Sequence, residues 1–95
     1  PTESAAKLEY KTKKQRQSAI NRKRGEVSRL EKEYEQIEAR IEELTHKLTL
    51  PEICTDYVKS SELSEELESI RERSNGVLAE WDEAQSELAK LIDDE

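Results

Sequence analysis

Two stretches of this sequence repeat their apolar residues at heptad spacing, and a proline-containing segment separates them. The first stretch places Ile20, Val27, Lys23, Leu30, Tyr34, Ile37, Ile41, Leu44 and Leu48 at the a and d positions. The second does the same with Leu63, Leu67, Ile70, Ser74, Val77, Trp81, Ala84, Leu88 and Leu91. A 3.5-residue period of this length is typical of a coiled-coil seam. The repeat therefore predicts two long helices that pair.

The composition agrees with paired helices and excludes a closed globular core. Apolar residues make up 33% of the 95 residues and charged residues 41%, and Phe and Met are absent. This is too little apolar material to enclose a core, while its regular placement argues against disorder. No apolar run approaches the roughly 20 residues that span a bilayer, and no signal peptide is visible. We expect a soluble, cytoplasmic protein without membrane contact.

The segment between the repeats, TLPEICTDYVKSS, makes the two helices antiparallel neighbours. Pro51 disfavours helix at the residue before it, so the first helix should end near Leu48. The second helix has two candidate N-caps, Asp56 or the Ser60/Ser61 pair, and the choice between them stays open. A short connector joins antiparallel helices. The predicted fold is therefore all-α, an antiparallel two-helix coiled-coil hairpin.

The expected organisation follows from these boundaries. Residues 1–15 are a basic linker or the start of helix 1, residues 16–92 form the hairpin, and residues 93–95 are an acidic tail. Within the hairpin, helix 1 covers about 16–48, the connector 49–61 and helix 2 about 57–92. Because the sequence begins at Pro1 rather than Met, we expect it to be part of a longer chain. Asn75-Gly76 lies inside helix 2, where glycine costs about 1 kcal/mol relative to alanine. A local kink or π-type irregularity is one interpretation of this site, and a helix carried through by tertiary packing is the other.

Opposing a with d positions closes nine layers without an insertion. The pairs are Leu48/Leu63, Leu44/Leu67, Ile41/Ile70, Ile37/Ser74, Tyr34/Val77, Leu30/Trp81, Val27/Ala84, Lys23/Leu88 and Ile20/Leu91. At the flanks this register predicts two favourable neighbours, Lys47/Glu66 and Glu38/Arg71, and two unfavourable ones, Glu33/Glu80 and Arg40/Arg73. Exposed ion pairs contribute under ~1 kcal/mol each, so they do not decide the register.

Residues capable of catalysis are sparse and scattered. The only glycines, Gly25 and Gly76, are isolated, which excludes a phosphate-binding glycine loop. His46 falls on the solvent side of the heptad without a second ligand at metal-binding spacing. Cys54 has no histidine partner and is expected to be a buried or half-buried small apolar residue. We predict no enzymatic activity, no catalytic residue, no metal site and no cofactor in this sequence.

Charge is distributed unevenly along the chain. Residues 1–50 hold twelve basic and nine acidic residues, whereas residues 51–95 hold four and fourteen. Eight cations concentrate in residues 7–24 against Glu9 alone, and they are Lys7, Lys11, Lys13, Lys14, Arg16, Arg22, Lys23 and Arg24. They form our candidate nucleic-acid-binding residues, because lysine and arginine release the counterions of phosphates. In the predicted register Arg16 lies level with Glu95 and Ser18 level with Asp93. A solvated linker, or a patch partly neutralised by Asp93, Asp94 and Glu95, is therefore an equally plausible interpretation.

Several of these segments resemble a known family. The basic LEYKTKKQR, the seam RLEKEYEQIEARIEELTHKL, the connector LPEICTDYVK and the tryptophan-bearing AEWDEAQSEL occur in the order found in the C-terminal coiled-coil domain of Uup-like ABC-F ATPases. The resemblance covers about residues 8–91, and its most specific elements are the Pro-Glu connector and the tryptophan element. Ile53-Cys54 and Asn75-Gly76 depart from the family's pattern.

The resemblance implies a non-catalytic domain of a cytoplasmic ATPase that acts on the ribosome or its tRNAs. DNA binding is attributed to this domain in the family, so the implied partners are DNA or RNA together with the ATPase modules, which would hold ATP and Mg²⁺. From the residues alone, a monomeric hairpin is expected. The competing hypothesis is a protein–protein spacer or dimerisation arm. A tRNA-gripping hairpin is less favoured, since its tip would carry only Lys59 as a cation.

Overall fold

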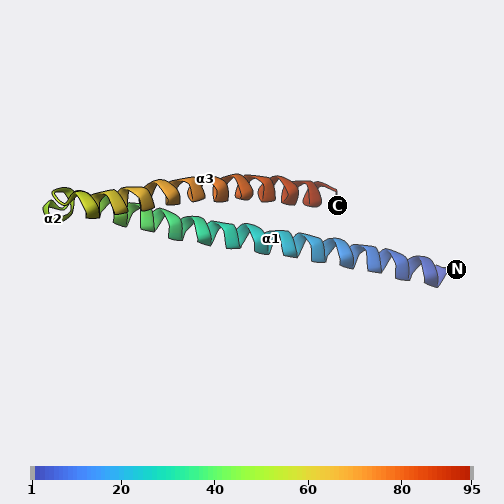
Figure 1. Cartoon of the computed structure of the whole chain (residues 1–95). Coiled ribbons are helices and arrows are strands. Elements are labelled where there is room, and N and C mark those ends of the chain that lie inside the picture. The colour runs from blue at the N-terminus through green and yellow to red at the C-terminus, as the bar shows by residue number, and fades with distance from the viewer. Residues whose placement is uncertain (1, 95) are drawn as a thin grey trace.

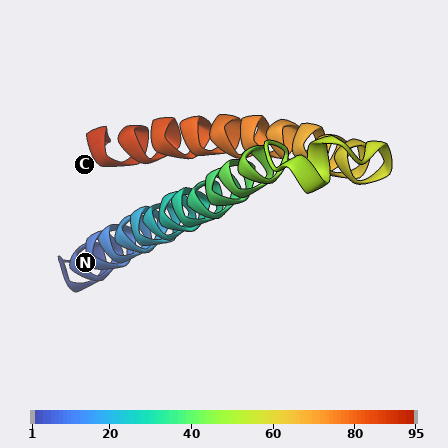
Figure 2. The same ribbon diagram turned by 90° about the vertical axis from the view of Figure 1, so that its left-hand side faces the viewer.

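The computed structural model describes residues 2–94, which form three helices: α1 (Thr2–Lys47), α2 (Pro51–Cys54) and α3 (Tyr57–Asp93). α1 and α3 run antiparallel along a rod of 79 × 15 × 14 Å, and α2 forms the turn at one end (Figure 1). Figure 2, turned by 90°, shows both helices side by side near α2 and drawing apart toward the termini. The predicted all-α helical hairpin is confirmed.

The turn is built from the residues that interrupt helix formation. Leu50 is extended, with φ −72° and ψ 134°, and Pro51 opens α2, where its missing N–H costs nothing. The backbone N–H of Lys59 donates to the Asp56 carboxylate at 3.1 Å, so Asp56 is the N-cap of α3. Of the two caps that the sequence allowed, the structure uses the earlier one, and α3 begins at Tyr57.

The seam residues make the core. Ile20, Val27, Leu30, Ile37, Leu44, Leu67, Ser74, Val77 and Ala84 are buried, and all are a or d residues of the predicted heptads. Tyr34, Ile41, Ile70, Trp81 and Leu88 pack against the central cluster. Of the five polar side-chain pairs that join α1 to α3 among the described residues, three lie within one residue of the partner in the predicted register, namely Lys23 with Glu87, Ser74 with Glu38 and Trp81 with Glu31. These contacts agree with that register.

Within the seam, two polar side chains find partners at its edge. The Ser74 hydroxyl, 7% exposed, donates to the Glu38 carboxylate at 3.0 Å. The Trp81 indole N–H donates to Glu31 at 3.1 Å while its ring packs on the core. Buried polar groups are stable only when they are hydrogen-bonded. Both residues can therefore occupy the seam without an unpaired polar atom.

The flanking ion pairs differ from the predicted ones. Arg73 binds Glu33 rather than facing Arg40, and Arg40 binds Glu66 through its Nη2 at 2.6 Å. Lys47, expected beside Glu66, pairs with Glu43 at 3.0 Å instead. The predicted partners of Glu33 and Arg40 were wrong by one heptad. Long flanking side chains can reach residues one heptad away from the position directly opposite. They therefore pair with an opposite charge there instead of lying beside a like charge.

The structure decides two further points. α3 is α-helical through Asn75 and Gly76, with no positive φ, so the helix continues there as the second interpretation has it. Packing of the neighbouring Ser74 and Val77 in the seam holds this turn helical despite the glycine. Cys54 is exposed at the turn rather than buried or half-buried, because the short α2 has no buried residue.

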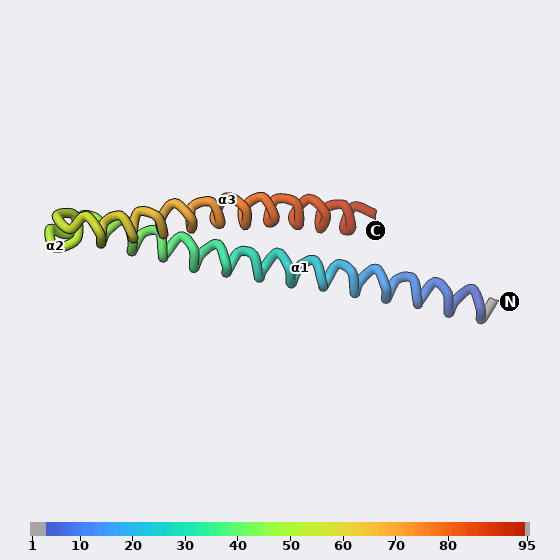
Figure 3. Tube along the Cα trace, in the orientation of Figure 1, coloured from blue at the N-terminus to red at the C-terminus, as the bar shows by residue number. Residues whose placement is uncertain are grey.

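α1 is the longer helix and extends beyond α3. Its 46 residues span about 69 Å and the 37 residues of α3 about 55 Å at 1.5 Å per residue. The tube in Figure 3 shows the N-terminal part of α1 continuing past the C-terminal end of α3. The segment interpreted as a linker or helix start is thus helical from Thr2, in keeping with its lack of internal Pro and Gly. We call residues 4–17 the overhang.

Candidate functional site

The eight basic candidate residues all lie on α1, from the overhang into the first paired turns. Six of them are exposed, namely Lys7, Lys11, Lys13, Lys14, Arg22 and Arg24, while Arg16 and Lys23 are partly covered. The helix carries them along one continuous rod but on different sides of it, so the structure spreads them along α1 rather than gathering them in a pocket. Such an arrangement suits a long anion better than a small molecule.

Lys23 is different from the other seven. Its ammonium group binds Glu26 at 2.9 Å on its own helix and Glu87 on α3, and its side chain is only 21% exposed. These hydrogen bonds, Glu87 first, raise the pKa of Lys23, and the Lys23 hydrogen bond lowers the pKa of Glu87. Lys23 therefore links α1 to α3 and stabilises the hairpin. It occupies a d position, opposite Leu88, where a heptad usually has an apolar residue.

The other seven candidates make no ion pair with any residue from 4 to 94. The predicted neighbour of Arg16, Glu95, lies outside the described residues. Asp93, predicted level with Ser18, makes no ion pair within that same range. Within the described chain, these cations thus remain available to an outside anion.

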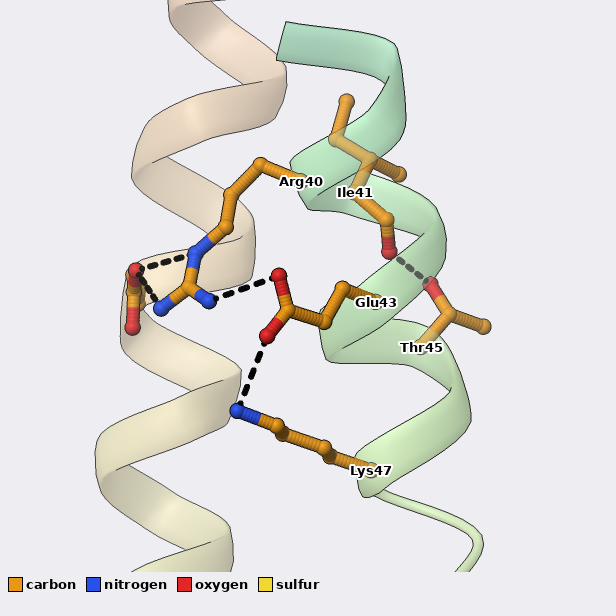
Figure 4. A network of polar contacts seen from close by, with 6 residues as sticks. Arg40, Ile41, Glu43, Thr45 and Lys47 are labelled. Atoms are coloured by element: carbon orange, nitrogen blue, oxygen red, sulfur yellow. Dashed lines mark hydrogen bonds and ion pairs between the residues drawn. The ribbon is translucent and has the colours of Figure 1, made fainter. Parts of the chain in front are cut away.

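The cations near the turn, in contrast to these seven, form ion pairs within the hairpin. Figure 4 shows the Arg40 guanidinium between α3 and Glu43, with Lys47 on the other oxygen of Glu43. Hydrogen bonds from Lys47 and Arg40 lower the pKa of Glu43, and those to Glu66 and Glu43 raise the pKa of Arg40. This network ties the helices together, so its positive charge is already compensated within the hairpin.

The described residues offer little for catalysis. None of their His, Cys, Asp and Glu side chains gather in a group of three that could hold a metal. His46 is exposed, as expected, and no helix in residues 2–94 is long and apolar enough to cross a membrane. A shallow notch beside the seam, lined by Tyr34, Leu78 and Trp81 with Glu31 and Glu35, was missed by sequence reasoning. Only the pairing of the two helices creates it.

Comparison with known families adds one finding to this geometry. The chain matches the ABC transporter C-terminal domain family over residues 7–86. It belongs to this family. The match begins at the first candidate cation and ends in the last third of α3, so it covers the basic segment, the turn and most of both seam helices of this ABC C-terminal domain. The resemblance inferred from the sequence is thereby confirmed as that of a C-terminal domain of an ABC-family protein.

Comparisons of the same chain with curated proteins and with solved structures gave no significant match. The fold and the site of this ABC C-terminal domain therefore rest on its own residues.

Proposed function

We propose that this ABC C-terminal domain is a non-catalytic nucleic-acid-contacting arm of a Uup-like ABC-F ATPase. The observation that carries the proposal is the overhang of α1, which holds Lys7, Lys11, Lys13, Lys14 and Arg16 beyond the end of α3. Phosphates attract such clustered, unpaired cations and release counterions on binding. The acidic remainder of the chain would repel the same ligand, so contact would be confined to α1.

The parent in this proposal is a cytoplasmic protein whose ATP and Mg²⁺ bind in separate modules. The ligand is DNA, or the RNA of the ribosome or tRNA, recognised through its backbone rather than its bases. This is supported by the straight, exposed helix, which presents cations without a concave site for a base. Tyr10, 68% exposed among the cations, could add stacking on an unpaired base.

The test is reversal of charge at Lys11, Lys13, Lys14 and Arg16 to Glu, followed by fluorescence anisotropy with labelled duplex DNA and RNA at several salt concentrations. The wild-type chain should bind with an affinity that falls steeply with salt, and the variant should lose binding. All four positions lie in the overhang, outside the seam, so the hairpin should remain folded by circular dichroism. Binding that is unchanged by the reversal would remove the basic segment from the mechanism.

A protein–protein spacer is the second candidate function, and the hairpin tip favours it. Tyr57 and Val58, 83% and 63% exposed, stand side by side at the start of α3 next to the turn. Paired exposed apolar residues often mark a protein contact. Sedimentation equilibrium separates the two ideas: a monomer across micromolar concentrations supports a self-contained hairpin, and a concentration-dependent dimer abolished by Tyr57→Ser/Val58→Ser supports the dimerisation arm.

A further inference from the structure

The side of α1 that faces away from α3 carries an uninterrupted positive stripe. In the heptad that places Ile20 at a, the positions farthest from the seam are b, c and f. From residue 7 to residue 32 these positions hold six cations and no acidic residue. The cations are Lys7, Lys11, Lys14, Arg22, Arg29 and Lys32, and every one of them is exposed. We call these six residues the outer stripe.

The acids of the same stretch point elsewhere. Glu9 falls at a d position, on the seam side of the heptad, Glu26 binds Lys23, and Glu31 accepts the Trp81 indole N–H. Just beyond the stretch, Glu33 binds Arg73 on α3. These carboxylates therefore lie toward the seam and not at the positions farthest from it. Glu33 also approaches Arg29, but only at 3.9 Å, and the Arg29 side chain stays 66% exposed.

The residues between the cations of the outer stripe are small or uncharged. Ser18, Gly25 and Ser28 occupy stripe-facing positions, and all three are exposed. The other positions of this face hold the uncharged Leu8, Gln15 and Asn21, so no acid repels a polyanion there, and the serine hydroxyls can donate to phosphate oxygens. The stripe measures about 37 Å from Lys7 to Lys32 at 1.5 Å per residue, close to one turn of a nucleic-acid duplex.

We propose that the phosphodiester backbone of the nucleic acid lies along the outer stripe and reaches Arg29 and Lys32, within the paired part of the hairpin. This rests on the proposed function and sharpens it in two ways. First, Arg29 and Lys32, which lie outside the basic segment 7–24, are added to the residues that contact the nucleic acid. Second, within that segment, the outward Lys11 and Lys14 contribute more than the inward Lys13 and Arg16.

The test compares pairs of neutralising substitutions by the salt dependence of binding to a 20-base-pair DNA duplex. The stripe variant is Arg29→Gln/Lys32→Gln, and its control is Lys59→Gln/Arg71→Gln, two exposed cations on α3. The slope of log K against log salt is negative, and each lost phosphate contact reduces its magnitude by about 0.9. The stripe variant should therefore have a slope about 1.8 smaller in magnitude than the wild type, and the control variant should have the wild-type slope. Within the overhang, Lys11→Gln/Lys14→Gln should reduce the magnitude of the slope more than Lys13→Gln/Arg16→Gln.

The outcomes separate the two proposals. If Arg29→Gln/Lys32→Gln leaves the slope unchanged while Lys11→Gln/Lys14→Gln reduces its magnitude, the contact ends in the overhang. The stripe proposal is then wrong although nucleic-acid binding stands. Equal losses from the outward and inward overhang pairs would also refute the outer stripe. If the wild-type chain shows no salt-dependent binding, the proposed function itself fails. Melting temperatures within a few degrees of wild type confirm that the variants are folded.

Discussion

Gly76 offers a sharp test of the hairpin, because the structure makes it an ordinary helical residue. It lies in the middle of α3, it is exposed, and its φ is negative. A Cβ atom added there would meet no atom within 4 Å. Gly76→Ala therefore removes the backbone freedom of glycine in the unfolded chain and adds no clash in the folded one.

The expected gain is about 1 kcal/mol in the free energy of unfolding, which is the difference in helix propensity between Ala and Gly. For a domain of this size, that raises Tm by about 4–8 °C. Thermal unfolding followed by circular dichroism at 222 nm measures the shift. The gain requires only that α3 is regular at Asn75-Gly76 and unfolds together with the rest of the hairpin.

Gly25→Ala is the matched control, since Gly25 is also helical, exposed and free of contacts within 4 Å. It lies on α1 opposite the C-terminal part of α3, roughly 15 Å along the rod from Gly76. The two gains should add, to about 2 kcal/mol in the double variant. A stabilising Gly25→Ala with a neutral or destabilising Gly76→Ala would refute the regular helix at Gly76 and restore the kink that the sequence suggested.

Three further predictions concern the seam, the turn and the ion pairs. Leu44→Ala, at a side chain with no exposed surface, should cost about 2–5 kcal/mol by denaturant unfolding, whereas Leu8→Ala in the overhang should change stability by less than about 0.5 kcal/mol. Asp56→Ala should cost about 1 kcal/mol by the same measurement, because it removes the only side-chain cap on α3 among the described residues. The Lys23 hydrogen bond lowers the pKa of Glu87, so this carboxylate stabilises the fold above its ordinary pKa and loses that contribution as the pH falls below about 4. Glu87→Gln should therefore lose less stability than wild type between pH 6 and pH 3 in parallel urea titrations, and an equal loss in both would contradict the Lys23–Glu87 pair.

The sequence was sufficient for the fold and the seam because heptad spacing acts over the whole length of the chain. Each apolar residue at a or d has one partner helix within reach, and a short proline-bearing connector leaves only the antiparallel arrangement. The buried set, from Ile20 to Ala84, follows from this pattern alone. The eight basic residues were also visible as a charge cluster, since composition does not depend on folding.

Only the tertiary structure shows which polar and charged side chains form contacts between α1 and α3. The heptad placed Lys23 on the seam opposite Leu88, but only the structure shows that its ammonium group binds Glu87 on α3. Arg40 and Glu33 selected partners one heptad from those predicted, because flexible side chains sample several positions and opposite charge decides among them. The acid-free outer stripe follows from the heptad positions, but only the structure shows that the neighbouring Glu31 and Glu33 bind Trp81 and Arg73 on α3. The apolar periodicity of each helix is enough to predict which residues are buried. The partner of a charged side chain depends on which residues of the other helix the fold places within its reach.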